Sequence, residues 1–219
     1  LGLASISVYG AVLAGWSSNN KYSLIGGLRA SSQMISYELA MGLAVLGVVM
    51  LSGSLSLIDI VNAQAGGRLF ALLQPLGFFI FCITMVAEAR RAPFDLPEAE
   101  QELVAGFHTE YSGMKFAMFY LAEYISMIVM SAIASSLYLG GWRGPFAEDY
   151  PILGFIYLFL KILIFLFVFV WIRATFPRLR YDRLMDVGWK ILLPLALLNL
   201  AITAVAVVAA DTRFFGLLG

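Results

Sequence analysis

Residues 152–173 read ILGFIYLFLKILIFLFVFVWIR, an apolar run of 22 residues in which Lys161 is the only charge before the terminal Arg173. About 20 apolar residues suffice for one helix to cross the hydrocarbon core of a bilayer. The run lacks the alternation of a barrel strand. Because backbone groups in lipid must hydrogen-bond within their own segment, this stretch predicts a transmembrane helix.

The composition of the whole chain agrees with a lipid environment. Of its 219 residues, 61% are hydrophobic and 13% charged, against about 45–50% and about 25% in soluble domains. One core of this size cannot bury the excess apolar surface. The formal net charge of zero gives no basic field for nucleic acid. The single cysteine, Cys82, excludes an internal disulfide and a cysteine-based metal cluster.

Apolar stretches recur along the chain and define its organisation. We expect an all-α, polytopic transmembrane protein with about six spans, near residues 1–15, 33–53, 69–89, 114–138, 152–173 and 187–209. They form one integral membrane domain over 1–219. The first stretch is short and begins at Leu1 rather than methionine, so we expect further sequence before it.

Lysine and arginine in the connections predict the orientation. Most of them follow the first, third and fifth spans, whereas the other connections and the tail hold only Arg68, Arg143 and Arg213. Cytoplasmic connections carry the excess of lysine and arginine, so the first set is expected to be cytoplasmic.

The cytoplasmic loop over 88–112 reads EARRAPFDLPEAEQELVAGFHTEYS and is unusually acidic. Its acids are Glu88, Asp95, Glu98, Glu100, Glu102 and Glu110. Asp95 followed three residues later by Glu98 resembles a capping box, which predicts a short helix over 96–105. Glu100, Glu102 and Glu110 have no such role. They either form a solvated face or line a proton path or a docking surface.

Two carboxyl groups are expected inside the membrane, where ionisable side chains are costly and by default suggest function. Glu38 lies about two turns into the second span, and Glu123 lies about 15 Å into the fourth, near the bilayer centre. Each is either a protonatable relay site or, for Glu38, one half of a structural pair with a nearby arginine.

The basic residues allow comparable alternatives. Lys161 enters the fifth span from the opposite side, and its depth suggests a Glu123–Lys161 pair. Arg173 belongs to a group of basic residues after the fifth span. They either reflect the cytoplasmic side of the membrane alone, or they bind acids of the long loop or contact a soluble partner. His108, the only histidine, is most simply a polar loop residue.

The loop and its flanks also resemble a known family. The matching residues are Arg91, Pro93-Phe94-Asp95, Pro97-Glu98-Ala99-Glu100-Gln101-Glu102-Leu103, His108-Thr109-Glu110-Tyr111-Ser112 and Ala122-Glu123-Tyr124. Ser36-Tyr37-Glu38, Gly140-Gly141-Trp142 and Ile172-Arg173-Ala174 extend the match along the chain. The sequence therefore resembles the H-subunit family of bacterial proton-translocating NADH-quinone oxidoreductase, respiratory complex I, known in mitochondria as NADH dehydrogenase subunit one.

The resemblance implies a function and a set of partners. A full family member has eight spans, two of which would precede Leu1. It helps to form a quinone chamber together with soluble subunits that supply the last iron–sulfur cluster. It couples quinone reduction to proton translocation by antiporter-like membrane subunits. Quinone is then a substrate at a shared site, no redox cofactor belongs to this chain alone, and the location is the bacterial inner membrane.

The same resemblance implies roles for individual residues. It gives no catalytic residue and no metal ligand in this chain. The proton-coupling candidates are Glu38, Glu123, Asp95, Glu98, Glu100, Glu102, Glu110 and Lys161. The candidates for the quinone chamber or the polar route are Arg91, His108 and Arg173.

Other functions remain open on the sequence. A related anchor subunit of a membrane-bound hydrogenase or formate hydrogenlyase would share the fold without using quinone. A stand-alone ion transporter would be expected to show paired repeats and broken helices, which are not evident. A purely structural anchor would not need Glu123 near the bilayer centre.

Overall fold

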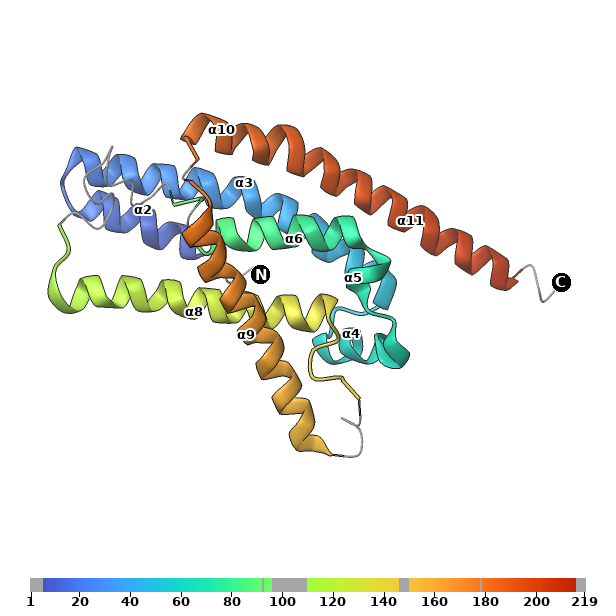
Figure 1. Cartoon of the computed structure of the whole chain (residues 1–219). Coiled ribbons are helices and arrows are strands. Elements are labelled where there is room, and N and C mark those ends of the chain that lie inside the picture. The colour runs from blue at the N-terminus through green and yellow to red at the C-terminus, as the bar shows by residue number, and fades with distance from the viewer. Residues whose placement is uncertain (1–5, 92, 96–109, 146–149, 178, 216–219) are drawn as a thin grey trace.

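The computed structural model describes residues 6–91, 93–95, 110–145, 150–177 and 179–215 (Figure 1). All regular structure within these ranges is helical. The elements are α2 (Ser7–Ser17), α3 (Lys21–Ser52), α4 (Leu57–Ala63), the 3₁₀ turn η1 (Ala65–Gly67), α5 (Phe70–Leu73), α6 (Pro75–Glu88), α8 (Gly113–Tyr138), α9 (Pro151–Thr175), α10 (Tyr181–Asp186), the π-helical segment η3 (Val187–Leu192) and α11 (Leu193–Phe215).

Four helical stretches are long and apolar enough to cross a membrane. They are α3, α8, α9 and the continuous stretch from α10 through η3 into α11. The shorter apolar helices α2 and α6 fall on the two remaining apolar runs. The expected all-α, polytopic membrane fold is confirmed. The positions at which the membrane surfaces cut these helices stay predictions, and the helix expected over 96–105 lies outside the described residues.

The central helix α3 begins and ends at polar or flexible residues. The Asn20 side chain accepts a hydrogen bond from the Tyr22 N–H at 3.0 Å, so α3 begins well before its apolar run. At its other end Gly53 adopts a left-handed φ of 68°, and its N–H donates to the Val49 carbonyl at 2.8 Å.

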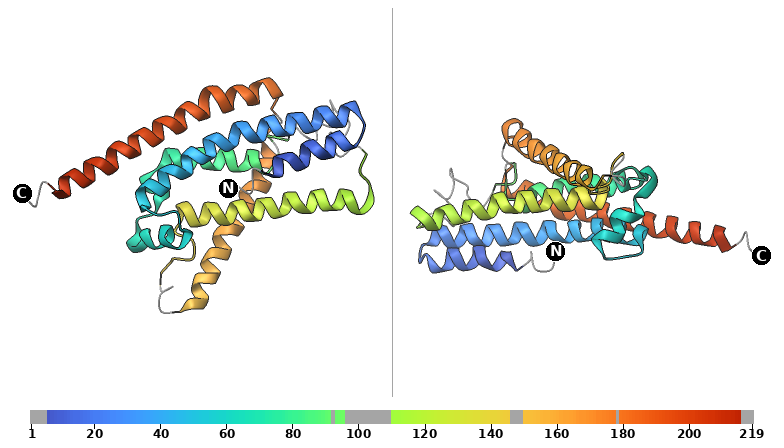
Figure 2. Two further views of the ribbon diagram at one scale, coloured as in Figure 1. Left: turned by 180° about the vertical axis from the view of Figure 1, so that it is seen from behind. Right: turned by 90° about the horizontal axis from the view of Figure 1, so that it is seen from below.

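The helices pack around α3. Helices α2, α6 and α11 contact it, and α9 crosses the others steeply (Figures 1 and 2). Small residues of α3, including Ser36, Ala40 and Ala44, are buried in these contacts. The Tyr138 hydroxyl of α8 donates to the Ala44 carbonyl at 3.2 Å, which ties α8 to the same face of α3.

Helix α6 is short because the chain breaks on both sides of it. Gln74 separates it from α5, and Pro75, which has no N–H to continue the helix, occupies its first position. Its 14 residues span about 21 Å. Both ends lie inside the packed helices, since Gln74 is 4% exposed and Glu88 is 9% exposed.

We predict that Gly27→Ala weakens the packing of α2 on α3. A Cβ atom at Gly27 would lie 2.9 Å from the Ala11 carbonyl oxygen, which is backbone and cannot move aside cheaply. The expected loss is about 1–3 kcal/mol of stability, measured as a lower thermal unfolding midpoint of the purified membrane protein. Gly10→Ala is the control because its Cβ meets nothing within 4 Å. Equal midpoints for both variants would contradict the packing.

Candidate functional site

A buried ion pair links the chain after α6 to the middle of α8. Arg91 Nη2 lies 3.4 Å from Glu123 Oε2, and the two side chains are 7% and 10% exposed. The Arg91 guanidinium also lies over the Tyr124 ring, 4.7 Å from its centroid. Glu123 is about 15 Å along α8 from Gly113, so the turn after α6 reaches the same level.

Further charges surround this pair. The carboxylates of Glu88 and Glu123 are both close enough to interact with the charge of Arg90. Glu38 of α3 is close enough to interact with Glu88. Glu38, Glu88, Arg90, Arg91 and Glu123 therefore form one group drawn from α3, the end of α6 and α8, which we name the charge cluster.

The backbone that carries the charge cluster is held from α3. The buried Gln33 amide donates from Nε2 to the Ala87 carbonyl at 3.0 Å and to the Phe94 carbonyl at 2.8 Å. Between these carbonyls Arg90 adopts a φ of 52°, a left-handed conformation that is uncommon without glycine. The Gln33 bonds fix this turn and so orient Arg90 and Arg91.

Parts of the charge cluster lack hydrogen-bond partners within the described residues. Glu88 Oε2 and Arg91 Nε are buried without one, and Arg91 Nη2 makes the ion-pair contact with Glu123 but no hydrogen bond. Buried ions are costly unless they are paired and hydrogen-bonded. The arrangement is therefore sensitive to any added proton or nearby charge.

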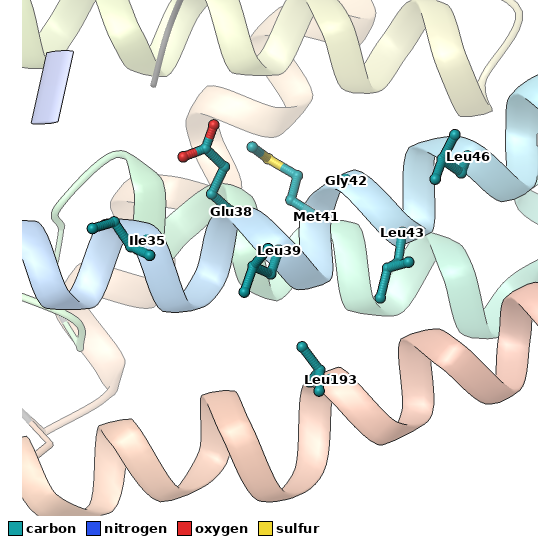
Figure 3. Close-up of a pocket in the computed structure, with 8 residues that line it drawn as sticks. All are labelled: Ile35, Glu38, Leu39, Met41, Gly42, Leu43, Leu46 and Leu193. Carbon is teal, nitrogen blue, oxygen red and sulfur yellow. The ribbon is translucent and has the colours of Figure 1, made fainter. Parts of the chain in front are cut away.

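Glu38 lies beside a groove between α3 and α11. The groove has a volume of about 440 Å³, and its other lining residues are Ile35, Leu39, Met41, Gly42, Leu43, Leu46 and Leu193. In Figure 3 the Glu38 carboxylate points away from Leu193 of α11. Glu38 is half-buried, so it is the member of the charge cluster that lies at the outer face of α3.

The other predicted acids are placed differently. Glu110 accepts a hydrogen bond from Asn20 Nδ2 at 2.9 Å, and the neighbouring Tyr111 hydroxyl donates to the Ala14 carbonyl at 3.1 Å. The end of the acidic loop is thus anchored at the connection from α2 to α3. Asp95 is half-buried just after the turn. The predicted residues Glu98, Glu100, Glu102 and His108 lie outside the described residues.

Neither basic candidate of α9 is seen to contact Glu123 among the described residues. The Lys161 ammonium donates to the carbonyls of Leu139, Gly141 and Arg143 at 2.7, 2.7 and 2.9 Å. Leu139 is 16 residues beyond Glu123, about 24 Å along α8. The hypothesis of a direct Glu123–Lys161 pair is therefore wrong. Arg173 is exposed in the last turn of α9, and none of the described residues is seen to pair with it.

Two members of the charge cluster are not evident in the sequence. In the sequence Glu88 is one of several acids of the loop, and Arg90 is one of the basic residues that indicate the cytoplasmic side. The available signal is that Glu88 directly follows an apolar run, so that a short helix could bury its last residue. Gln33, which holds the turn, carries no sequence signal of its own.

The fold and the charge cluster together define an all-helical, polytopic membrane protein that keeps ionisable side chains buried between its helices. A family model described as NADH dehydrogenase matches residues 1–204. The chain belongs to this family.

Individual relatives carry a more specific name, the H subunit of NADH-quinone oxidoreductase. The chain is 59% identical over 204 residues to the relative from Protochlamydia amoebophila, a match that covers 93% of this chain and 61% of the relative. It is 57% identical over 207 residues to one from Geobacter metallireducens, covering 94% and 59%. It is 54% identical over 210 residues to one from Dehalococcoides mccartyi, covering 96% and 58%. The chain thus spans about three fifths of the length of these curated relatives.

We predict that Arg91→Met is strongly destabilising because it removes the cation that faces the buried Glu123 carboxylate. The expected loss is about 3 kcal/mol. Denaturant unfolding of the detergent-solubilised protein measures it. Arg180→Met is the matched control, since the Arg180–Asp182 pair is 79% and 70% exposed and should contribute at most about 1 kcal/mol. Equal losses of stability in Arg91→Met and Arg180→Met would contradict a stabilising role for the Arg91–Glu123 ion pair.

We predict that Lys161→Met destabilises the turn after α8, because three carbonyl oxygens lose one shared donor. The expected loss is about 1–2 kcal/mol, reduced from the buried value because Lys161 is only half-buried. The thermal midpoint measures it. Lys190→Met, which breaks only the exposed Lys190–Asp186 pair, should have little effect. A larger loss in the control would contradict the role of Lys161.

Proposed function

We propose that this chain is a membrane subunit of a proton-translocating NADH-quinone oxidoreductase. In this role it helps to form the quinone chamber and couples quinone reduction to proton translocation. The charge cluster is the observation that carries the proposal. Membership of the NADH dehydrogenase family and the names of the relatives supply the reaction.

The charge balance of the cluster suits a coupling role. With every group ionised, it holds the three carboxylates of Glu38, Glu88 and Glu123 against the two guanidinium groups of Arg90 and Arg91. One bound proton makes the cluster neutral. Burial favours this neutral state. Because charges interact strongly in a buried site, a change of charge at a nearby quinone would alter how readily the cluster holds that proton.

The turn after α6 offers a path for the signal, because it carries Arg91 and continues toward Asp95 and the acidic loop. In this proposal a change of charge at the quinone alters the contact between Arg91 and Glu123, and Glu38 passes the altered charge to the α3 side. Electrons stay on quinone and on the other subunits, and the residues of this chain hold or release protons.

The partners follow from the same role. Soluble subunits complete the quinone chamber, and antiporter-like membrane subunits receive the coupling signal beyond Glu38. Quinone binds at a site shared between subunits, and the complex resides in the bacterial inner membrane. Asp95, Glu98, Glu100, Glu102 and Glu110, with His108 and Arg173, stay candidates for the route between chamber and cluster. The contacts of Lys161 favour a structural role for that residue over proton coupling.

We predict that Glu123→Gln and Glu38→Gln each lower NADH-driven quinone reduction, proton pumping or both by several-fold, because an amide cannot exchange the proton. Activity and pumping are measured in inverted membrane vesicles. Asp186→Asn, on an exposed pair with Lys190, is the control and should retain both. Wild-type turnover with normal proton pumping in both glutamate variants would contradict the coupling role of Glu38 and Glu123.

Gentle purification of the tagged full-length protein separates the proposal from its alternative. Inhibitor-sensitive NADH-quinone reduction in the co-purifying multi-subunit fraction supports the assignment. Hydrogen evolution without NADH oxidation would instead place the chain in a membrane-bound hydrogenase or formate hydrogenlyase.

A further inference from the structure

A second buried polar group lies at the opposite end of α6 from the charge cluster. Gln74, Asn199 and Thr203 are 4%, 5% and 5% exposed. Gln74 Nε2 donates to Thr203 Oγ1 at 2.6 Å, and that hydroxyl donates to the Asn199 carbonyl at 2.8 Å. These bonds connect the break between α5 and α6 to the middle of α11.

Two amide atoms of this group have no hydrogen-bond partner among the described residues. They are Gln74 Oε1, an acceptor, and Asn199 Nδ2, a donor. Each orphaned polar atom costs about 1–3 kcal/mol when buried. Both atoms face the same glycine, since a Cβ on Gly77 would lie 2.9 Å from Asn199 Nδ2 and 3.3 Å from Gln74 Oε1. They are therefore at most about 6 Å apart.

Glycine on α3 and on α6 lets the Gln74 and Asn199 amides pack closely against these helices. A Cβ on Gly47 of α3 would meet Gln74 Nε2 at 2.9 Å and Oε1 at 3.0 Å. A side chain at Gly47 would therefore clash with the Gln74 amide, and one at Gly77 would clash with both amide groups. The site is enclosed by α3, α6 and α11.

We propose that Gln74 and Asn199 hold one ordered water molecule between α3, α6 and α11. Water both donates and accepts, so one molecule satisfies Gln74 Oε1 and Asn199 Nδ2 together, and two bonds of about 2.8 Å bridge atoms up to about 5.6 Å apart. The N–H groups of Asn199 Nδ2 would repel a bound cation, and the oxygen Gln74 Oε1 would repel a bound anion. The bond to Thr203 fixes the orientation of the Gln74 amide, and exchanging the nitrogen and oxygen of Asn199 leaves two acceptors to which a single water donates.

The water also has a mechanical consequence. The break at Gln74 leaves α6 without a helical continuation to fix its position along its axis. The bridge from Gln74 to Asn199 adds to the direct Gln74–Thr203 hydrogen bond, and together they link the start of α6 to α11. Because α6 is a rigid helix of 14 residues, it also positions Glu88 at the far end.

The direct test is a structure of the intact complex at a resolution that shows ordered water. We expect one peak within hydrogen-bond distance of both Gln74 and Asn199. A direct Gln74–Asn199 hydrogen bond with no peak would overturn the proposal. A peak with the short, multiple oxygen contacts of a metal cation would do so as well.

Variants provide a second, independent test in the same complex. Gly77→Ala should remove the peak and lower the thermal midpoint, whereas Gly42→Ala, whose Cβ meets nothing within 4 Å, should preserve both. Gln74→Leu and Asn199→Leu should each lower the midpoint, and the double variant should lose less than the sum of the two shifts. Additive shifts, or a peak that survives Gly77→Ala, would contradict a shared water. Neither readout depends on enzymatic activity, so this test is separate from that of the proposed function.

Discussion

The structure depends on how the polar groups at the two ends of α6 are satisfied. A helix of 14 residues ends inside the surrounding helices on both sides. Irregular backbone at such depth is tolerated only where protein or water satisfies it. At the Glu88 end, Gln33 of α3 binds the carbonyls on either side of the turn. The turn therefore places Arg90 and Arg91 among the packed helices, where Arg91 pairs with Glu123.

This constraint explains why the charge cluster forms where it does. Arg91 reaches Glu123 only because the chain leaves α6 on the level of the middle of α8. Glu38 approaches the same place from α3, beside a groove at the surface of the described chain. The cluster thus lies between the turn after α6 and the part of α3 that borders the groove. That arrangement favours a coupling element over a simple structural anchor.

The sequence is sufficient for the fold class but not for the contacts. Hydropathy locates the apolar stretches, because their length reflects the bilayer itself. It cannot show that α6 is broken at Gln74 or that Glu88 is buried, since both depend on the neighbouring helices. Glu38 and Glu123 are found because a charge within an apolar run is conspicuous. The Glu123–Lys161 pair fails because depth counted from helix ends says nothing about lateral position, and carbonyls of the nearby turn are available to Lys161.

Infrared difference spectroscopy of the intact complex, with quinone switched between its oxidised and reduced forms, would show whether the charge cluster exchanges protons. We expect a change in the carbonyl stretch of a protonated carboxyl group, and the loss of that band in a Glu88→Gln or Glu123→Gln variant. A spectrum without any carboxyl band, or with a band that persists unchanged in both variants, would contradict proton exchange at the charge cluster.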